Sequence, residues 1–523
     1  TIMNKISFIS ILAVFALLFQ GCSNLHEDIL NEQDNSSLVD NSSNAAMVAA
    51  PSIAVLRDFM DTGGLWALTE CSTDECCFPT RGSDWNDVNN RTLFQHTYDY
   101  TNTHIKNAWN ALMSGLTRSN VSLYYLSSME QTDTVKEYTS EVYFIRDLCM
   151  YYLMDYWGHF PMRGYSETDY SSQPIILSRT EALNQIVSNL DSIIPNLKEK
   201  GDVPYGRITR ATAQTLLAHI YLNYQVFTGT APVFPDGTAK WDKVISLCDD
   251  IINSGKYKLA DDYWKLYLSD NATYADQTEA ILPIVYDQAA GVSGNSWLNV
   301  TLHYNQTFNN FTSFWNGCCT TPTFLASWDV TDPRYSNDRL KSQIGFNIGI
   351  LVGQQYSVSG KKLTTRQGAD LNFTPEFSVD NATEAQGARI VKYAPDPNYK
   401  WGSGSDNDVM YFRYSDIYLM RGEAKFRNKD ISGALDDINA VRKARGVKSY
   451  TVSNLTLEDF YKERGYEFYW DGAWRRDDMV RFNHYCEARY NVDACDVTKI
   501  LFPIPNTALE SNSELKQNDG YAN

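Results

Sequence analysis

The chain has 523 residues, of which 43% are hydrophobic and 21% charged, and this composition excludes wholesale disorder and collagen-like or disulfide-scaffold classes. Its 63 acidic and 45 basic residues give a formal net charge of −18, which disfavours binding of DNA or RNA by phosphate neutralisation. The hydrophobic core of a folded chain can bury many of the 34 Tyr, 23 Phe and 12 Trp residues. Tyr and Trp in such numbers also supply flat surfaces for polar ligands with apolar faces, above all sugars.

The N-terminus has the pattern of a secretory signal. An apolar run over residues 6–19 follows Lys5 and precedes Gly21-Cys22. This run is shorter than the roughly 20 residues that a permanent membrane helix needs. The Gly-Cys junction resembles a bacterial lipoprotein signal, which predicts residues 1–21 as a signal peptide and acylation of Cys22. An ordinary signal peptide with an incidental cysteine is the alternative.

Residues 22–50 are polar and have no helical or strand period, so we predict an acylated, flexible tether. We expect the rest of the chain, residues 51–523, to form a single soluble domain.

The nine cysteines after Cys22 contain no Cys-x-x-Cys pair, which argues against zinc ribbons and thioredoxin-like sites. An oxidising compartment permits disulfides such as Cys486–Cys495, but the sequence does not assign pairs, and we expect mostly buried thiols with one or two bridges.

Several segments have the 3.6-residue period of amphipathic helices. The helices that we expect cover residues 104–129, 135–156, 181–197, 209–227, 241–254, 413–427 and 430–446. Asp430 is a suitable N-cap for the last of them, and Gly446 a suitable residue to end it. Antiparallel helix pairs that bury their faces against neighbouring pairs are typical of a tetratricopeptide-like superhelix. The predicted fold is therefore mostly α.

The helical period disappears between about residues 271 and 407. Gly, Asn, Ser, Thr and aromatic residues dominate there, with short strand-like pieces at 280–286 and 388–393. We predict a long loop-rich insertion that carries short strands. A loop-rich insertion of this length in a helical protein more often forms a functional surface than a simple connection between helices.

The most specific motifs lie mainly in the C-terminal third. In chain order they are RDLCMYYLMDYWGHFPM (146–162), RYSDIYLMRGEA (413–424), ALDDINAVR (434–442), ERGYEF (463–468), DGAWRRDDMVR (471–481) and LFPIP (501–505). Together these motifs resemble the SusD/RagB family of nutrient-binding outer-membrane lipoproteins. The resemblance covers essentially the whole chain from Cys22 onward.

The resemblance implies a function. It predicts a tetratricopeptide-like scaffold with a glycan-binding face, lipid-anchored in the outer membrane and facing the cell exterior. It further implies that the protein delivers oligo- or polysaccharide to a partner, a SusC-like TonB-dependent transporter, without catalysis. We predict no cofactor and assign no metal-ligating residues, and the sequence leaves open whether calcium orders the loops. Some relatives, of the RagB type, capture peptides instead, and peptide capture is the alternative.

In that family, glycan contacts tend to come from an N-terminal loop region and from loops near the middle of the chain. Sugar binding needs a flat ring against the C–H face of a pyranose and planar or charged groups for its paired hydroxyls. Residues 71–98 and 297–328 supply both kinds of group. The ligand-binding residues that we predict are Arg81, Trp85 and Asn90 in the first loop, and Trp297, Tyr304 and Trp315 in the second. We expect about half of the loop aromatics to be core anchors, Trp328 among them.

A cluster of charged residues around Glu463 and Glu467 invites an enzymatic interpretation, because the two carboxylates share one helix face. Arginines crowd the same stretch, however, and would remove the raised pKa that a catalytic acid needs. We therefore predict a structural ion-pair network. Metalloprotease, serine-esterase and nucleotide-binding motifs are absent from the sequence. A surface glycosidase remains the least favoured alternative.

Overall fold

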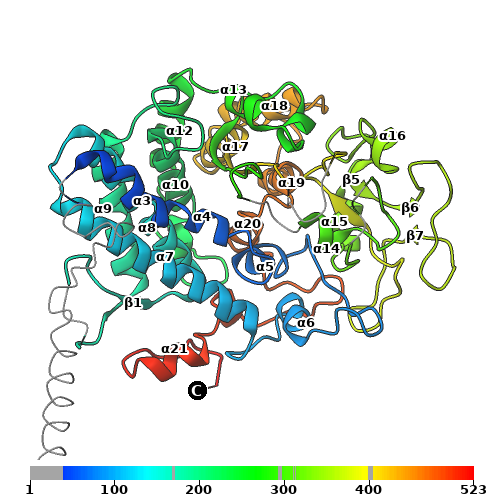
Figure 1. Ribbon diagram of the computed structural model, residues 1–523, viewed down its shortest axis with the longest axis horizontal. Helices are drawn as coiled ribbons and strands as arrows, with labels where there is room; N and C mark the ends of the chain where they lie inside the picture. Colours follow the sequence, from blue (N-terminus) through cyan, green and yellow to red (C-terminus); the bar gives the residue numbers. More distant parts are fainter. Residues whose placement is uncertain are drawn as a thin grey trace, which may run out of the picture.

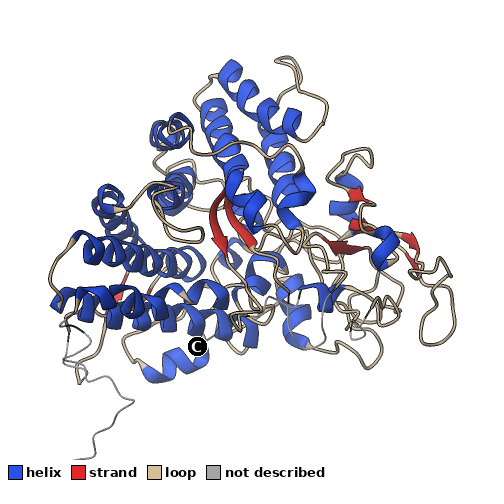
Figure 2. Cartoon of the chain, turned by 45° about the horizontal axis from the view of Figure 1, so that its top comes forward, coloured by secondary structure: helices blue, strands red, loops and turns tan. Residues whose placement is uncertain are grey.

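The computed structural model describes residues 41–167, 171–292, 297–309, 311, 314–398 and 405–522, together with Val39. Long helices fill the left and upper part of the view in Figure 1, whereas short strands and loops gather on the right. Figure 2 shows the same division between helices and the loop-rich part. None of the helices in the described part of the chain combines the length and hydropathy that a membrane span requires.

A short helix of the body begins inside the segment predicted as a tether. A short 3-10 turn at Ser42–Asn44 leads directly into α3 (Ala45–Ile53). The small residues of α3 allow it to pack closely against α7 (Thr103–Ser128) and α8 (Asp133–Trp157). The predicted end of the tether at residue 50 is therefore wrong. The predicted signal peptide and Cys22 lie outside the described residues.

The helices α7 and α8 form the first antiparallel pair and agree with the predicted segments. The side chain of Asn102 accepts hydrogen bonds from two backbone N–H groups in the first turn of α7, and Thr132 caps α8 in the same way. α9 (Arg179–Ile193) packs against α8 and begins with a capping box formed by Ser178 and Glu181.

The next helices continue the superhelix through side-by-side packing. α12 (Trp241–Asn253) contacts both α10 (Arg210–Leu222) and α17 (Tyr414–Arg427), and α17 in turn contacts α18 (Ile431–Ala444) and α19 (Leu457–Phe468). Asp430 caps α18 by accepting a hydrogen bond from the Gly433 N–H, as predicted. Gly446 follows that helix with a φ of 68°, a value that favours glycine.

Short strands connect distant parts of the chain. β3 (Ala280–Ile284) pairs antiparallel with β9 (Val409–Arg413), which leads into α17. Within the loop-rich insertion, β4 (Ser336–Asn337), β5 (Ile348–Leu351) and β8 (Arg389–Val391) form a three-stranded antiparallel sheet. The other strands form the antiparallel pairs β1 (Phe160–Met162) with β2 (Ile175–Leu177) and β6 (Gly353–Gln354) with β7 (Asn372–Phe373). The remaining α-helices are α4 (Val55–Asp58), α5 (Leu65–Glu70), α6 (Val88–Gln95), α11 (Tyr224–Thr228), α13 (Ala272–Gln277), α14 (Trp297–Thr301), α15 (Pro322–Ser327), α16 (Lys341–Ile344), α20 (Arg475–Arg481) and α21 (Asn506–Ser511).

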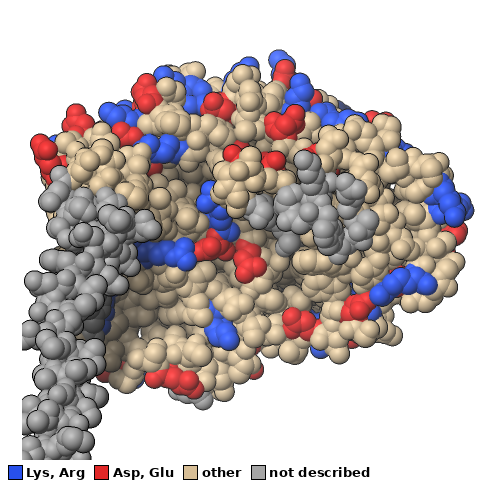
Figure 3. Space-filling model, viewed as in Figure 1, with Lys and Arg blue, Asp and Glu red and all other residues tan. Residues whose placement is uncertain are grey.

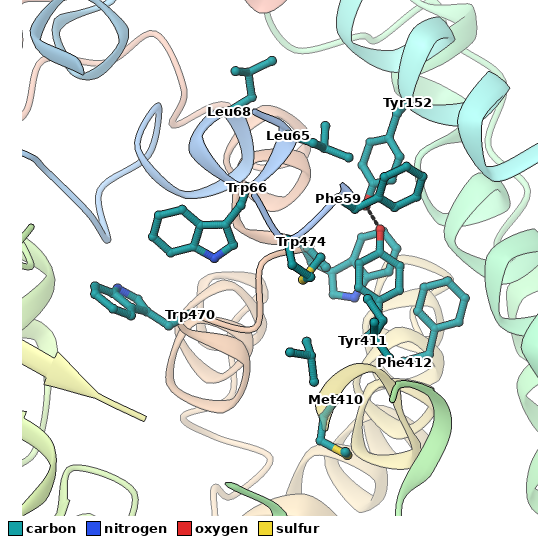
Figure 4. Packing of buried hydrophobic residues seen from close by; sticks show 14 of the residues in the cluster. Phe59, Leu65, Trp66, Leu68, Tyr152, Met410, Tyr411, Phe412, Trp470 and Trp474 are labelled. Atoms are coloured by element: carbon teal, nitrogen blue, oxygen red, sulfur yellow. Dashed lines mark hydrogen bonds between the residues drawn. The ribbon is translucent and has the colours of Figure 1, made fainter. Parts of the chain in front are cut away.

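The main core lies where α5, α8, β9 and the segment after α19 meet, and its aromatic rings are drawn in Figure 4. Trp66 and Trp470 meet edge to face, with ring centroids 5.7 Å apart. The hydroxyls of Tyr152 and Tyr411 share a hydrogen bond, which satisfies two buried polar groups. Trp328 is buried too, as predicted for a core anchor.

The acidic cluster near the C-terminus forms a buried ion-pair network, as predicted. Glu467 binds three guanidinium groups, with N–O distances of 3.0 Å to Arg334, 2.7 Å to Arg413 and 2.6 Å to Arg445. Burial alone would raise the pKa of Glu467, but the three cations hold it well below its usual value. A carboxylate in this state is a poor general acid, so the cluster ties helices together instead.

Candidate functional site

Two loops that are far apart in the sequence lie side by side and form the candidate site. Residue Cys77 in the segment after α5 pairs with Cys319 in the loop between α14 and α15. Each donates its backbone N–H to the other's carbonyl oxygen over 2.9 Å. The two loops predicted to bind ligand therefore meet, and they bring Trp85 close to Trp315.

Trp85 and Trp315 are directly linked. The Trp85 Nε1–H donates a hydrogen bond to the Trp315 carbonyl oxygen over 2.8 Å. The Trp85 indole lies against Gly317, where a Cβ atom would approach its ring carbons to 2.6 Å, so glycine is required for this contact. The side chain of Trp315 itself is 40% exposed and Trp85 is partly exposed.

Tyr304 joins the same surface through polar contacts. Its hydroxyl donates to Asp84 Oδ2 over 2.7 Å, and the guanidinium group of Arg366 lies 4.1 Å above its ring centre. Arg366 also pairs with the carboxylates of Asp84 and Glu384, each over 2.5 Å. We call Trp85, Tyr304 and Trp315, with Asp84 and Arg366 at the edge, the aromatic platform.

The charged groups at the platform are held in fixed ionisation states. Burial would raise the pKa of Glu384, but hydrogen bonds from the Arg366 backbone, its guanidinium group and His303 lower that pKa to about 2. Burial lowers the pKa of His303 to about 4, so its ring is neutral at pH 7. Hydrogen bonds from Tyr304 and Arg366 lower the pKa of Asp84. Neither carboxylate has the raised pKa of a general acid.

Arg81 is beneath the surface and supports the loops. Its side chain is only 4% exposed, and its guanidinium group donates to the backbone carbonyl oxygens of Gly317, Thr383 and Gln386. Because these carbonyls belong to the neighbouring loops, Arg81 fixes the positions of the segments that carry the platform. Its third nitrogen, Nη2, has no hydrogen-bond partner but is buried, so it does not face a ligand at the surface.

Asn90 and Trp297 are also buried, against the expectation that they face a ligand. The Asn90 side chain accepts a hydrogen bond from His104 Nε2 over 2.9 Å and fixes α6 against α7. Trp297 is 2% exposed and stacks on Trp66 at a centroid distance of 5.6 Å. Its indole N–H donates to the Met60 carbonyl oxygen, so the ring anchors the start of α14 in the core.

Arg366 was not predicted as a site residue. It lies 282 positions from Asp84 in the sequence, and only the fold brings the two side chains together. The side chains of Arg366 and Asp84 are 48% and 32% exposed, so polar groups border the aromatic rings. Flat rings next to planar charged groups suit a ligand that has both apolar C–H faces and paired hydroxyls.

A separate hollow of about 390 Å³ lies beside α7 and the loop after β1. Its lining includes Met113, Val121, Tyr124 and Tyr165, and its charged pair Arg163–Glu167 is mutually neutralised.

Over the face drawn in Figure 3, Lys and Arg are interspersed with Asp and Glu. Among the described residues, no group of three or more His, Cys, Asp or Glu side chains could hold a metal ion.

Comparison with known proteins gives two matching family models and several similar proteins, and these matches agree with one another. A model of the SusD family matches residues 278–495, and a model described as "Starch-binding associating with outer membrane" matches residues 40–222. The chain is 25% identical over 492 residues to the starch-binding protein SusD of Bacteroides thetaiotaomicron, an alignment that covers 86% of this chain and 84% of that protein.

Solved structures share the fold. The surface glycan-binding protein A from Bacteroides uniformis superposes with a TM-score of 0.70 at 19% identity, covering 91% of this chain and 99% of the other. The surface glycan-binding protein A from Bacteroides thetaiotaomicron in complex with laminarihexaose gives a TM-score of 0.68 at 18% identity, covering 91% and 99%. These likenesses confirm the mostly helical, tetratricopeptide-like fold.

Proposed function

Because the chain belongs to the SusD family, whose members are non-catalytic binding proteins, we propose that it binds an oligo- or polysaccharide on the aromatic platform. The observation that carries this proposal is the partly exposed pair of linked indoles, Trp85 and Trp315, next to the stacked Tyr304 and Arg366 side chains. Of the relatives named above, one is a starch-binding protein and another was solved in complex with laminarihexaose, and both of these ligands are glucans.

The binding energy that the platform can supply favours an oligomer over a single sugar as the ligand. One sugar ring stacked on an indole contributes about 1–2 kcal/mol from buried apolar area, and each good hydrogen bond contributes about 1 kcal/mol. Millimolar affinity already requires about 4 kcal/mol of net binding free energy, after the cost of immobilising the ligand has been met. Several rings must therefore engage Trp85, Tyr304 and Trp315 together.

We further propose that the protein acts at the exterior face of the outer membrane. The support comes from the Gly21-Cys22 lipoprotein pattern, which lies outside the described residues, and from the family description "associating with outer membrane". Acylation of Cys22 would supply the anchor. In this location the bound glycan passes to a partner, a SusC-like TonB-dependent transporter, for import.

Native affinity electrophoresis tests the proposal. The purified protein is run through gels that contain soluble plant, fungal or host polysaccharides, with starch and laminarin included. We expect retardation by at least one polysaccharide, and Trp315→Ala should weaken it by roughly 5- to 30-fold, because one stacked ring is lost.

The matched control is Tyr124→Ala, which removes an exposed ring from the separate hollow beside α7. We expect this variant to bind like the wild type. If no polysaccharide in the panel retards the protein, or if the wild type and Trp315→Ala bind equally, glycan binding on the platform is refuted. Release of new reducing ends by the purified protein would refute the non-catalytic role.

A further inference from the structure

The hollow beside α7 lies apart from the aromatic platform, and one face of α7 forms its floor. Met113, Thr117, Val121 and Tyr124 line it and recur at the three- and four-residue spacing of a helix stripe. We call these four residues the α7 stripe. Val121 is 49% exposed and Tyr124 is 44% exposed, so the described residues leave the stripe partly uncovered.

The opposite wall of the hollow comes from β1 and the loop that follows it. Met162 of β1 and Tyr165 of the loop belong to the lining. The Asn120 side chain of α7 donates a hydrogen bond to the Arg163 carbonyl oxygen over 3.1 Å and so fixes this wall to the helix. Because Arg163 and Glu167 pair with each other, the lining offers apolar contact and no net charge.

The N-terminal segment leaves the body close to this hollow. Val39 packs against the small core cluster that α3 forms with α7 and α8. Tyr125 and Tyr165 pack against the same cluster and also line the hollow. The residues before Val39 therefore start from a point near the α7 stripe.

The sequence before Val39 contains one apolar cluster. Leu25, Ile29 and Leu30 lie within six residues, whereas residues 31–37, which separate them from the body, are all polar. These residues lie outside the described part of the chain. The nine steps from Leu30 to Val39 reach up to about 30 Å when extended. The α7 stripe is about 17 Å long, so the linker permits the cluster to reach it.

We propose that residues 25–30 dock on the α7 stripe and place the Leu25, Ile29 and Leu30 side chains in the hollow. The contact removes apolar surface of both partners from water. Because the segment belongs to the same chain, its effective concentration at the hollow is on the order of millimolar, which favours it over a separate partner.

Docking shortens the tether. Only Ser23 and Asn24 then separate Cys22 from the docked residues, so an acylated Cys22 holds this side of α7 close to the membrane surface. The docking itself depends neither on acylation nor on glycan binding, and its tests are independent of both.

Photo-crosslinking tests the contact. The chain from residue 22 onward, made with Cys22→Ser to keep it free of lipid, carries benzoylphenylalanine in place of Val121. We expect irradiation to link position 121 to residues 25–30 of the same chain, as located by mass spectrometry. The same probe in place of Val330, which is 71% exposed in the loop after α15, is the control and should not reach those residues.

A matched pair of variants separates docking from mere proximity. Ile29→Asp puts a charge into the apolar cluster and should reduce the crosslink by about tenfold or more. Ser36→Asp puts the same charge into the polar linker and should leave the crosslink unchanged. A crosslink that survives Ile29→Asp, a crosslink to a second copy of the chain, or no crosslink from position 121 would overturn the proposal.

Limited proteolysis gives an independent readout. A glutamate-specific protease can cut after Glu27, within the docked residues, and after Glu32, within the linker. Cleavage after Glu27 requires the undocked state, so Val121→Asp should speed it by about tenfold and leave cleavage after Glu32 unchanged. If Val121→Asp leaves the rate after Glu27 unchanged, the segment does not dock on the α7 stripe.

Discussion

Gly317 supports the Trp85 indole, and adding one methyl group there should disable the platform without unfolding the protein. A Cβ atom at this position would lie 2.6 Å from two carbons of the Trp85 ring and 2.9 Å from the Val300 carbonyl oxygen. Normal carbon contacts are about 3.5–4.0 Å, so in Gly317→Ala the ring must move by roughly 1 Å or more. Because the Val300 oxygen belongs to the backbone, the Trp85 indole is the group that we expect to shift further.

The expected loss follows from the contacts that the indole would give up. The hydrogen bond to the Trp315 carbonyl is lost from the free and the bound protein alike, so it lowers stability by about 1 kcal/mol but not affinity. A misaligned ring also forfeits about 1–2 kcal/mol of stacking with a sugar, which predicts a fall in glycan affinity of about 5- to 30-fold. Overpacking should cost about 1–3 kcal/mol of stability, which leaves a protein of this size folded.

Isothermal titration with the polysaccharide that binds the wild type measures the loss, and tryptophan fluorescence reports the displaced ring. Gly63→Ala is the matched control, because a Cβ there meets its nearest side-chain atom at an ordinary 3.7 Å. If Gly317→Ala folds and keeps its affinity within about twofold of the wild type, the indole does not contact the ligand as proposed.

Three further perturbations have defined outcomes. Burial raises the pKa of Asp147 to about 8, so the contribution of this group to stability should fall as pH rises from about 4, where the unfolded chain ionises, towards 8. Glu141 and Asp408, whose pKa values burial also raises, add to the same slope, so Asp147→Asn should reduce it and raise the melting temperature at pH 7 but not at pH 4, as measured by calorimetry. Glu467→Gln leaves three buried arginines under-compensated and should lower the free energy of unfolding by about 3–5 kcal/mol in denaturant titrations; a change below 1 kcal/mol would contradict the network's role. Cys22→Ala should move the protein from the membrane fraction to the soluble fraction on cell fractionation, and unchanged membrane association would exclude acylation of Cys22 as the anchor.

Local sequence patterns were sufficient to predict the longer paired helices, because their information lies within one or two turns, whereas short helices such as α5, α6 and α20 were not predicted. The apolar period located α7, α8 and α17, and the capping side chain of Asp430 located the start of α18. The end of the tether was missed, since a run of alanines has no amphipathic period, although its small residues let α3 pack closely against two longer helices. The pairing of β3 with β9 depends on residues more than a hundred positions apart.

The candidate site was predictable only in part, because residue type does not determine burial. Trp85 and Trp315 lie partly exposed at one surface, whereas Trp297 has the same aromatic chemistry and lies in the core. Arg81 satisfies backbone carbonyls, a role that its sequence neighbourhood does not distinguish from ligand binding. Arg366 belongs to the site through contacts between loops that no local pattern records.

The position of α3 has a mechanical consequence. In Figure 1, α3 lies among the long helices on the left, and α6, which directly follows the Trp85 loop, lies below and to the right of α5. In a body held by its N-terminus, a pulling force would act first on the interface of α3 with α7 and α8. Such a force would therefore reach these long helices before it reached the loops that carry the platform.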